Sequence, residues 1–116
     1  MPVLDSSESD IGKLAPGVQR VELVNGTLGA TSLTVADLSV GPRATVPTHT
    51  HPTEEAMVII EGELDAIIGD EVVPVTPGRT VLAPSGVRHG FVNRSETTAR
   101  IMAVFPTSKV ERTLVE

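Results

Sequence analysis

The sequence contains no cysteine, tryptophan or tyrosine, and its only benzene rings belong to Phe91 and Phe105. Without cysteine, disulfides and thiolate metal sites are excluded, and we expect the protein in the reducing cytoplasm. Stacking of a sugar or a nucleobase on aromatic rings is nearly excluded as well. The net charge of −6 leaves no basic surface for a nucleic-acid backbone, so we expect no nucleic-acid partner.

Long hydrophobic runs are also missing. No apolar stretch approaches the roughly 20 residues that cross a bilayer, and the N-terminus lacks the basic start and apolar core of a signal peptide. We therefore expect no membrane partner. The 116 residues fit one domain. Because residues 1–13 are polar and acidic, we predict a flexible N-terminal segment there and a single β-barrel domain over residues 14–116.

Short segments rich in valine, isoleucine, leucine and threonine follow one another from residue 18 onward, and glycine, proline, asparagine and aspartate separate them. This pattern is typical of β-strands joined by turns, and no stretch has the sustained 3.6-residue apolar period of a helix. Many short strands favour a sandwich or a barrel. The strands that we expect cover residues 18–24, 31–40, 44–51, 55–61, 63–68, 71–75, 79–83, 88–93, 98–105 and 109–115. We expect tight turns at Gly62, Gly69-Asp70, Pro77-Gly78 and Pro84-Ser85-Gly86.

The three histidines of the chain carry the most informative pattern. His49 and His51 are two residues apart, so in a strand both rings face the same side. Glu55 follows after a possible bend at Pro52, and His89 comes after a turn that can return a strand to the same end of a barrel. Neutral imidazoles and a carboxylate are suitable ligands for Fe(II), Mn(II), Ni(II), Cu(II) or Zn(II). Glu54 is the competing carboxylate, but its position favours a direction into solvent.

Two motifs at these residues resemble those of the cupin superfamily, and the chain is similar to its small single-domain microbial members. The first cupin motif runs G-x5-H-x-H-x3,4-E-x6-G and the second runs G-x5-P-x-G-x2-H-x3-N. The matching segments are His49-x-His51-x3-Glu55-x6-Gly62 and Gly78-x5-Pro84-x-Gly86-x2-His89-x3-Asn93. One departure is that Arg43 stands where the first motif has its leading glycine. The turn before residue 44 can therefore differ in shape, and the role of Arg43 stays open.

The resemblance implies the fold, the ligands and the assembly. The expected fold is all-β, a cupin double-stranded β-helix or jelly-roll barrel, assembled as a homodimer. The implied ligands of one divalent transition metal are His49, His51, Glu55 and His89. Fe(II) or Mn(II) is favoured, whereas Ni, Cu and Zn are alternatives. Glu55 could also act as a catalytic base, and Asn93 is expected to support a turn.

Three function classes follow from this reading. The leading hypothesis is a metal-dependent dioxygenase that acts on a small organic substrate. The first alternative is a non-redox metal-dependent isomerase, lyase or cyclase, which would need a second acid–base group that the sequence hardly offers. The second alternative is a non-catalytic protein that binds a small ligand. A fold alone does not decide between these classes.

Several further residues are candidates for the cavity. Met57, Ile59, Phe91 and Met102 are candidate lining residues, with ordinary core packing as the alternative for each. Arg88 and Arg100 could bind an anionic substrate, although Arg88 adjoins a ligand and is expected to point away from the interior. We expect Glu61 and Glu63 to be solvated charges at strand ends.

Overall fold

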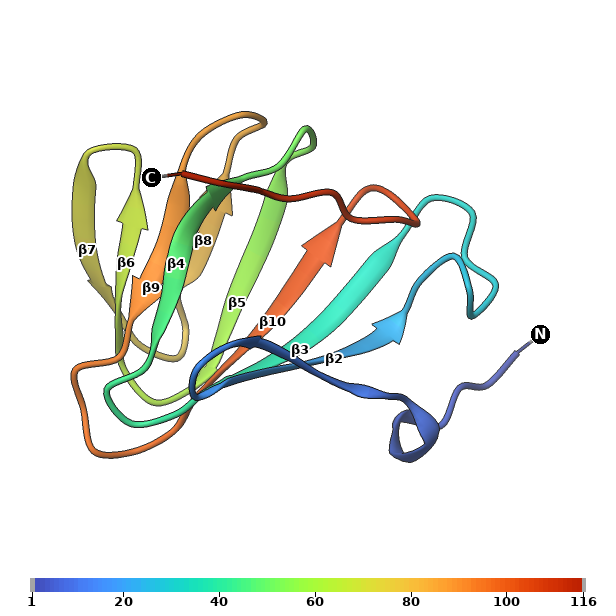
Figure 1. Ribbon diagram of the computed structural model, residues 1–116, viewed down its shortest axis with the longest axis horizontal. Helices are drawn as coiled ribbons and strands as arrows, with labels where there is room; N and C mark the ends of the chain where they lie inside the picture. Colours follow the sequence, from blue (N-terminus) through green and yellow to red (C-terminus); the bar gives the residue numbers. More distant parts are fainter. Residues whose placement is uncertain (1, 116) are drawn as a thin grey trace.

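Two antiparallel sheets make up the computed structural model, which describes residues 2–115 (Figure 1). The six-stranded sheet has the order β1 (Ile11–Ala15), β2 (Val18–Val24), β3 (Thr34–Val40), β10 (Ala99–Phe105), β5 (Glu55–Glu61) and β8 (Thr80–Ala83). The five-stranded sheet has the order β11 (Thr113–Leu114), β4 (Thr45–Thr50), β9 (His89–Val92), β6 (Leu64–Ile68) and β7 (Glu71–Val75). In the described part, the only helical element is the 3-10 turn Ser6–Glu8, and no helix is long and apolar enough to cross a membrane. The predicted all-β, jelly-roll architecture is confirmed.

Most of the expected strands are present, and three differences stand out. The strand expected over residues 31–40 begins only at Thr34. The strand expected over 109–115 is wrong for most of its length, because only Thr113–Leu114 pairs with β4. Strand β1 was not expected, and it begins inside the segment 1–13 by pairing with β2. In each case tertiary pairing, rather than local β-propensity, decides where the strand lies.

The core lies between the two sheets. Strands β3 and β10 alternate strictly between buried and half-buried residues, so every second side chain points inward. The first five residues of β5 alternate in the same way. The fully buried inward residues include Ala36, Val40, Ala99 and Ile101. This alternation places one face of each strand against the facing sheet and leaves the other face outside.

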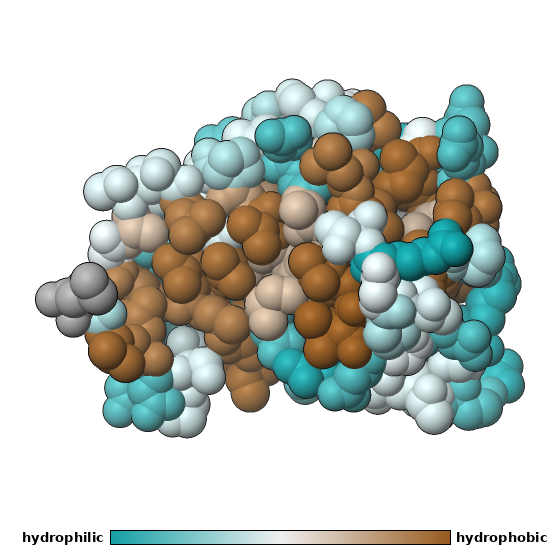
Figure 2. Space-filling model, turned by 180° about the vertical axis from the view of Figure 1, so that it is seen from behind, coloured by the Kyte–Doolittle hydropathy of each residue, from teal (hydrophilic) through white to brown (hydrophobic). Residues whose placement is uncertain are grey.

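The outward side of the six-stranded sheet is apolar as well. Val58 of β5 is the register partner of Met102 of β10, and Ala56 is the partner of Leu82 of β8. The side chains of Ile60 and Leu82 are 40 % and 58 % exposed. Figure 2, seen from behind the view of Figure 1, shows a broad hydrophobic area on that face of the molecule. A contiguous exposed apolar surface is typical of an interaction site.

Two turns show how closely the motif positions follow backbone geometry. Gly62 has a φ of +81°, and a Cβ there would lie 2.9 Å from Cα of Ala99, so both conformation and space require glycine. Arg43 has a φ of +60° and is the only described non-glycine residue with positive φ. The chain therefore keeps, with an arginine, the left-handed backbone for which glycine is suited. Arg43 forms an exposed ion pair with Glu96.

Asn93 ties together the loops at one end of the barrel. Its side chain is fully buried, and Nδ2 lies within 3.0 Å of the carbonyl oxygens of Val40, Gly41 and Thr97. Its Oδ1 accepts hydrogen bonds from the backbone N–H and the hydroxyl of Ser95. The amide thus supports the turns that precede β4 and β10.

Candidate metal centre

The four residues of the first and second motifs come from both sheets. His49 on β4 and His89 on β9 are direct register partners in the five-stranded sheet. His51 lies one residue past the end of β4, and Glu55 is the first residue of β5 in the facing sheet. The chain between β4 and β5 thus crosses from one sheet to the other. The site therefore lies inside one end of the barrel.

A close approach of two strands brings His49 opposite His89. The pairing of β4 with β9 changes register between Val46 and His49. At this irregularity a Cβ on Gly90 would lie only 2.5 Å from the carbonyl oxygen of Val46. Gly90 is therefore required by space, because any side chain would push the two strands apart.

The four side chains converge in a buried cluster. One ligand atom from each of His49, His51, Glu55 and His89 lies within 4.8 Å of the others, and none of the residues is more than 6 % exposed. Glu55 Oε1 lies 2.8 Å from His89 Nε2 and 3.3 Å from His51 Nε2. Glu54, the competing carboxylate, is exposed. The structure brings together all four residues that the sequence singled out, and they form a possible metal site.

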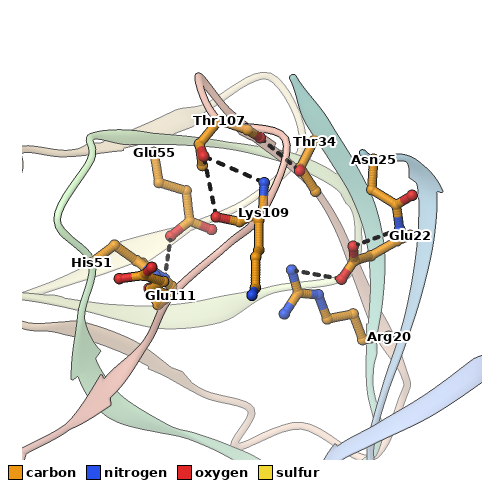
Figure 3. A network of polar contacts seen from close by, with 9 residues as sticks. All are labelled: Arg20, Glu22, Asn25, Thr34, His51, Glu55, Thr107, Lys109 and Glu111. Carbon is orange, nitrogen blue, oxygen red and sulfur yellow. Dashed lines mark hydrogen bonds and ion pairs between the residues drawn. The ribbon is translucent and has the colours of Figure 1, made fainter. Parts of the chain in front are cut away.

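A backbone carbonyl orients each imidazole. Nδ1 of His49 lies 2.7 Å from the carbonyl oxygen of Pro47. Nδ1 of His89 lies 3.0 Å from the carbonyl oxygen of Val87. In His51, Nδ1 lies 2.6 Å from the carbonyl oxygen of Glu111, which the C-terminal segment brings across the barrel end (Figure 3). Because a carbonyl oxygen only accepts, each Nδ1 carries the donating proton. Each Nε2 is then left to face the centre of the cluster, as in histidines that hold a metal.

The cluster perturbs the pKa values of its own groups. Burial lowers the pKa of His49 to about 4, although its hydrogen bond to Pro47 raises it. Burial opposes ionisation of Glu55, but the hydrogen bonds from His51 and His89 and the charges of these histidines together outweigh burial and lower the pKa of Glu55. Burial lowers the pKa of His89, but its hydrogen bonds to Glu55 and to the carbonyl oxygen of Val87 and the charge of Glu55 together outweigh burial and raise it. A buried carboxylate that is kept charged among imidazoles is the donor set of a divalent cation.

A small cavity adjoins the cluster and has a volume of about 20 Å³. That is room for little more than one water molecule. Apart from the four clustered residues, its lining is apolar except for two arginines; the lining residues are Leu14, Arg20, Leu38, Val46, Met57, Phe91, Ile101, Phe105 and Arg112. Glu55 is the only carboxylate among them.

Of the four other candidate lining residues, two line the cavity and two do not. Met57 and Phe91 line the cavity, as expected. Ile59 is buried in the core, and Met102 is wrong as a lining residue because it lies on the outward side of β10 beside Val58. The physical reason is the strand period, since Met102 has the opposite parity to the buried Ile101.

The two arginines named as candidates for anion binding, Arg88 and Arg100, do not line the cavity. Arg100 forms ion pairs with Asp37 and Glu61 at 2.7 and 3.2 Å, and Arg88 does not line the cavity. Arg43 precedes the start of β4, whereas His49 and His51 lie at the end of that strand. Glu61 is an exposed strand-end charge, as expected.

Sequence reasoning missed Arg20 and Arg112 at the cavity. For Arg20 a signal existed, because it shares the parity of the buried Val18 on β2 and is therefore an inward-facing charge. Arg112 had no such signal, because its place depends on how the C-terminal segment crosses the barrel. Both arginines lie far in sequence from the two motifs, so the sequence did not indicate that they line the same cavity.

Two proteins from Streptomyces species are similar in sequence to this chain. The curated polyketide synthase CurC of Streptomyces cyaneus is 29 % identical over 101 residues, which are 86 % of this chain and 66 % of that protein. SchB of Streptomyces halstedii is 32 % identical over 87 residues, 74 % of this chain and 63 % of that protein. The chain thus spans less than two thirds of the length of these relatives.

A solved structure shows the same fold. The polyketide cyclase RemF from Streptomyces resistomycificus superimposes with a TM-score of 0.81 at 22 % identity, and the match covers 100 % of this chain and 87 % of that one. The family model described as a cupin domain matches residues 37–105, which include both sheets' contributions to the cluster. Because the two motifs, the fold and this match all agree, the chain belongs to the cupin family.

Proposed function

We propose that this protein is a metal-dependent enzyme in which His49, His51, Glu55 and His89 hold one divalent transition metal. The observation that carries the proposal is the orientation of the three imidazoles, each held at Nδ1 by a backbone carbonyl, which leaves Nε2 as the ligand atom. In His51 and His89, Nε2 lies 3.3 and 2.8 Å from Oε1 of Glu55, and a divalent cation is a partner that this carboxylate and the imidazole nitrogens can share. Fe(II) and Mn(II) are favoured for such mixed nitrogen and oxygen donors.

The residues of the chain would hold the ion and exclude water. A bound Fe(II) or Mn(II) supplies Lewis-acid and redox chemistry. The apolar side chains of Met57, Phe91 and Phe105 line the adjoining cavity, and an apolar lining strengthens electrostatic interactions. Glu55 is the one residue in the lining that could accept a proton from a substrate as a base.

The reaction that we propose first is a dioxygenase reaction on a small organic substrate. Apart from Glu55, the cavity lining offers no carboxylate and no tyrosine or lysine, so general acid–base chemistry has few participants. The test is oxygen consumption by the iron- or manganese-loaded protein with a panel of phenols, diketones and thiols. Turnover that continues unchanged without oxygen would reject the oxygenase.

The second candidate is a non-redox cyclase, isomerase or lyase reaction. The specific observation in its favour is the similarity to the polyketide synthase CurC and to the fold of the polyketide cyclase RemF. The zinc-loaded protein separates the two candidates, because zinc has no redox chemistry. Anaerobic turnover with zinc supports this candidate, whereas its absence together with oxygen-dependent turnover supports the first. Tight ligand binding that survives metal removal, without turnover, would instead indicate a non-catalytic binding protein.

Metal content tests the proposed ligands directly. We expect about one metal ion per chain in protein purified from its native host, as elemental analysis measures it. The change Glu55→Gln, like His51→Ala, should remove most of it, because each deletes a ligand. The matched control is Glu54→Gln, which changes an exposed carboxylate one residue away. Equal metal content in Glu55→Gln and Glu54→Gln would reject the assignment.

We also propose that the chain forms a homodimer through the outward side of the six-stranded sheet. Ile60 and Leu82 are exposed on this apolar side, and the ion pairs of Arg100 with Asp37 and Glu61 lie on the same sheet. An apolar centre with polar surroundings is typical of a subunit interface. In analytical ultracentrifugation we expect Leu82→Lys to be a monomer. Val72→Lys, at a similarly exposed position of β7, should stay dimeric, and equal masses for both variants would reject this interface.

A further inference from the structure

Two arginines from opposite ends of the chain meet at the cavity beside the metal centre. Arg20 comes from β2, and Arg112 from the C-terminal segment just before β11, and both line the same cavity. The metal site requires neither of them. Two positive charges placed together in a largely apolar lining cost free energy, because each charge repels the other and both lose contact with water. This cost requires a compensating interaction.

Several polar atoms of these arginines have no partner. Among residues 2–115, Nε and Nη2 of Arg20 and Nη1 of Arg112 are buried without a hydrogen bond. A buried donor without an acceptor costs free energy that is recovered when an acceptor binds. The two guanidinium groups remain protonated in proteins. The unmatched donors therefore indicate a missing anionic acceptor.

The neighbouring charges do not cancel the two cations. Glu22 Oε2 lies 3.3 Å from Arg20 Nη2, which is an ion-pair distance without hydrogen-bond geometry (Figure 3). Glu22 is also engaged by the side-chain amide of Asn25. Burial, followed by the charge of Arg20, lowers the pKa of Arg112. Glu22 is thus an ion-pair partner of Arg20 alone, and Glu55, which lines the same cavity, accepts no hydrogen bond from the unmatched nitrogen atoms of either arginine.

Both arginines are connected to the same metal-site histidine. The guanidinium carbon of Arg20 lies 5.8 Å from the ring centre of Phe105, and Phe105 packs edge-on against His51 at 5.0 Å. Arg112 follows Glu111, whose carbonyl oxygen accepts the hydrogen bond from His51. One residue therefore lies between each arginine and His51, Phe105 in the case of Arg20 and Glu111 in the case of Arg112. An anion between them would lie next to the metal centre.

The charges of a surface groove that shares Arg20 with the cavity determine which end of a bound molecule would face the arginines. Arg20 also lines a surface groove of about 530 Å³, a volume that suits a small organic molecule. The charged residues that line the groove are the acidic Glu8, Asp10 and Glu22 and the basic Lys13 and Arg20. Three carboxylates thus outnumber two cations in the groove, whereas the cavity, which shares Leu14 and Arg20 with the groove, carries both Arg20 and Arg112.

We propose that Arg20 and Arg112 bind the carboxylate of a small organic acid whose uncharged body extends into the groove. A carboxylate is planar and small enough for the tight inner end, and it matches the paired N–H groups of a guanidinium. This inference names the substrate class of the metal site and so rests on the proposed function.

The test compares butyrate with butyramide, which has the same shape but no charge. Binding is measured by NMR titration of the metal-free and the zinc-loaded full-length protein, so that coordination of the carboxylate by the metal is separated from binding by the arginines. We expect the metal-free protein to prefer butyrate by about tenfold or more, the effect of a hydrogen bond to a charged group. Arg20→Gln and Arg112→Gln should each remove most of this preference.

Three controls keep the result clear. Arg94→Gln changes an exposed arginine that pairs with Asp65 outside the cavity, and it should retain the preference. Arg20→Lys keeps the charge and should retain part of it, which separates loss of charge from loss of folding. Elemental analysis of Arg20→Gln and Arg112→Gln should show unchanged metal content.

The outcomes reject different statements. Equal binding of butyrate and butyramide by the metal-free wild type, or an undiminished preference in both glutamine variants, overturns the carboxylate site. Tighter binding of methyl phosphate than of butyrate overturns the assignment to a carboxylate. A protein that binds no metal but prefers butyrate keeps this site and rejects the metal enzyme, whereas metal binding without the preference rejects this site alone.

Discussion

At the scale of single residues, His89 links the folding of the barrel to metal binding. Its Nδ1 faces the carbonyl oxygen of Val87 and its Nε2 faces a carboxylate oxygen of Glu55. Burial lowers the pKa of His89, but the oxygen atoms at its two nitrogens and the charge of Glu55 together outweigh burial, raise the pKa and favour a proton at Nε2. A metal ion at Nε2 takes the place of that proton.

Metal binding should therefore release a proton at neutral pH. Because the pKa of His89 is raised, a larger share of this ring is protonated at pH 7, and metal affinity should fall by about tenfold per pH unit below that pKa. His49 does not add to this loss until near pH 4, since burial lowers its pKa to about 4. Calorimetric titration with zinc in buffers of different ionisation heat measures the release. Binding heats that are the same in every buffer would contradict the prediction.

Asn93 shows how one buried amide can support two loops. Replacement by alanine would leave buried carbonyl groups and the Ser95 N–H without partners. We expect Asn93→Ala to lower the free energy of unfolding by about 3 kcal/mol, as urea denaturation measures it. The control Asn25→Ala removes a partly buried amide and should cost less. Equal losses in the two variants would contradict the role of Asn93.

At the scale of elements, the pairing of β4 with β9 decides the geometry of the site. These strands hold His49 opposite His89, and they approach so closely at Gly90 that no side chain fits there. The glycine thus supports the proposed metal site without being one of its four ligands. Its neighbour in sequence, His89, keeps its position only while the two backbones remain this close.

The change Gly90→Ala should weaken stability and metal binding together. The added Cβ would meet the carbonyl oxygen of Val46 at 2.5 Å, and relieving the clash moves the strands apart at a cost of about 1–3 kcal/mol. Urea denaturation and zinc titration measure the two effects. Gly12→Ala is the matched control, since its Cβ would make an ordinary contact at 3.5 Å. A Gly90→Ala protein with normal zinc affinity would contradict this account.

Local sequence predicts strands that are long and strongly patterned, and it fails at the ends of the chain. The segments 18–24, 55–61 and 71–75 were predicted with the bounds that the structure shows. At 109–115 the alternating residues would suit a strand, but most of them cross the barrel end, where the backbone of Glu111 binds His51. At β1 the pairing with β2, rather than composition, forms the strand.

At the scale of the whole molecule, the metal centre joins the two sheets. His49 and His89 belong to the five-stranded sheet and Glu55 to the six-stranded one, while the carbonyl oxygen of Glu111 adds the C-terminal segment. An ion bound to all four side chains would cross-link these parts in the folded state only. Ligands that bind only the folded state stabilise it.

Removing the metal should therefore lower the melting temperature of the protein. At a free metal concentration of about 100 times Kd, binding adds about 2.7 kcal/mol, so chelation should lower Tm by about 5 °C or more. Thermal scans with and without a chelator measure the shift. The Glu55→Gln protein should show no shift on chelation. An unchanged Tm of the wild type after metal loss would contradict this role.

The sequence by itself determined the family, the all-β class and the four clustered residues, because the ligands sit in two short motifs whose spacing reflects strand and turn geometry. The left-handed backbone at Arg43 and the outward direction of Met102 required the structure. The cavity pair Arg20 and Arg112 also appeared only in three dimensions. Such residues are brought together by sheet closure and by the path of the C-terminal segment, and no local pattern encodes contacts between elements so distant in the chain.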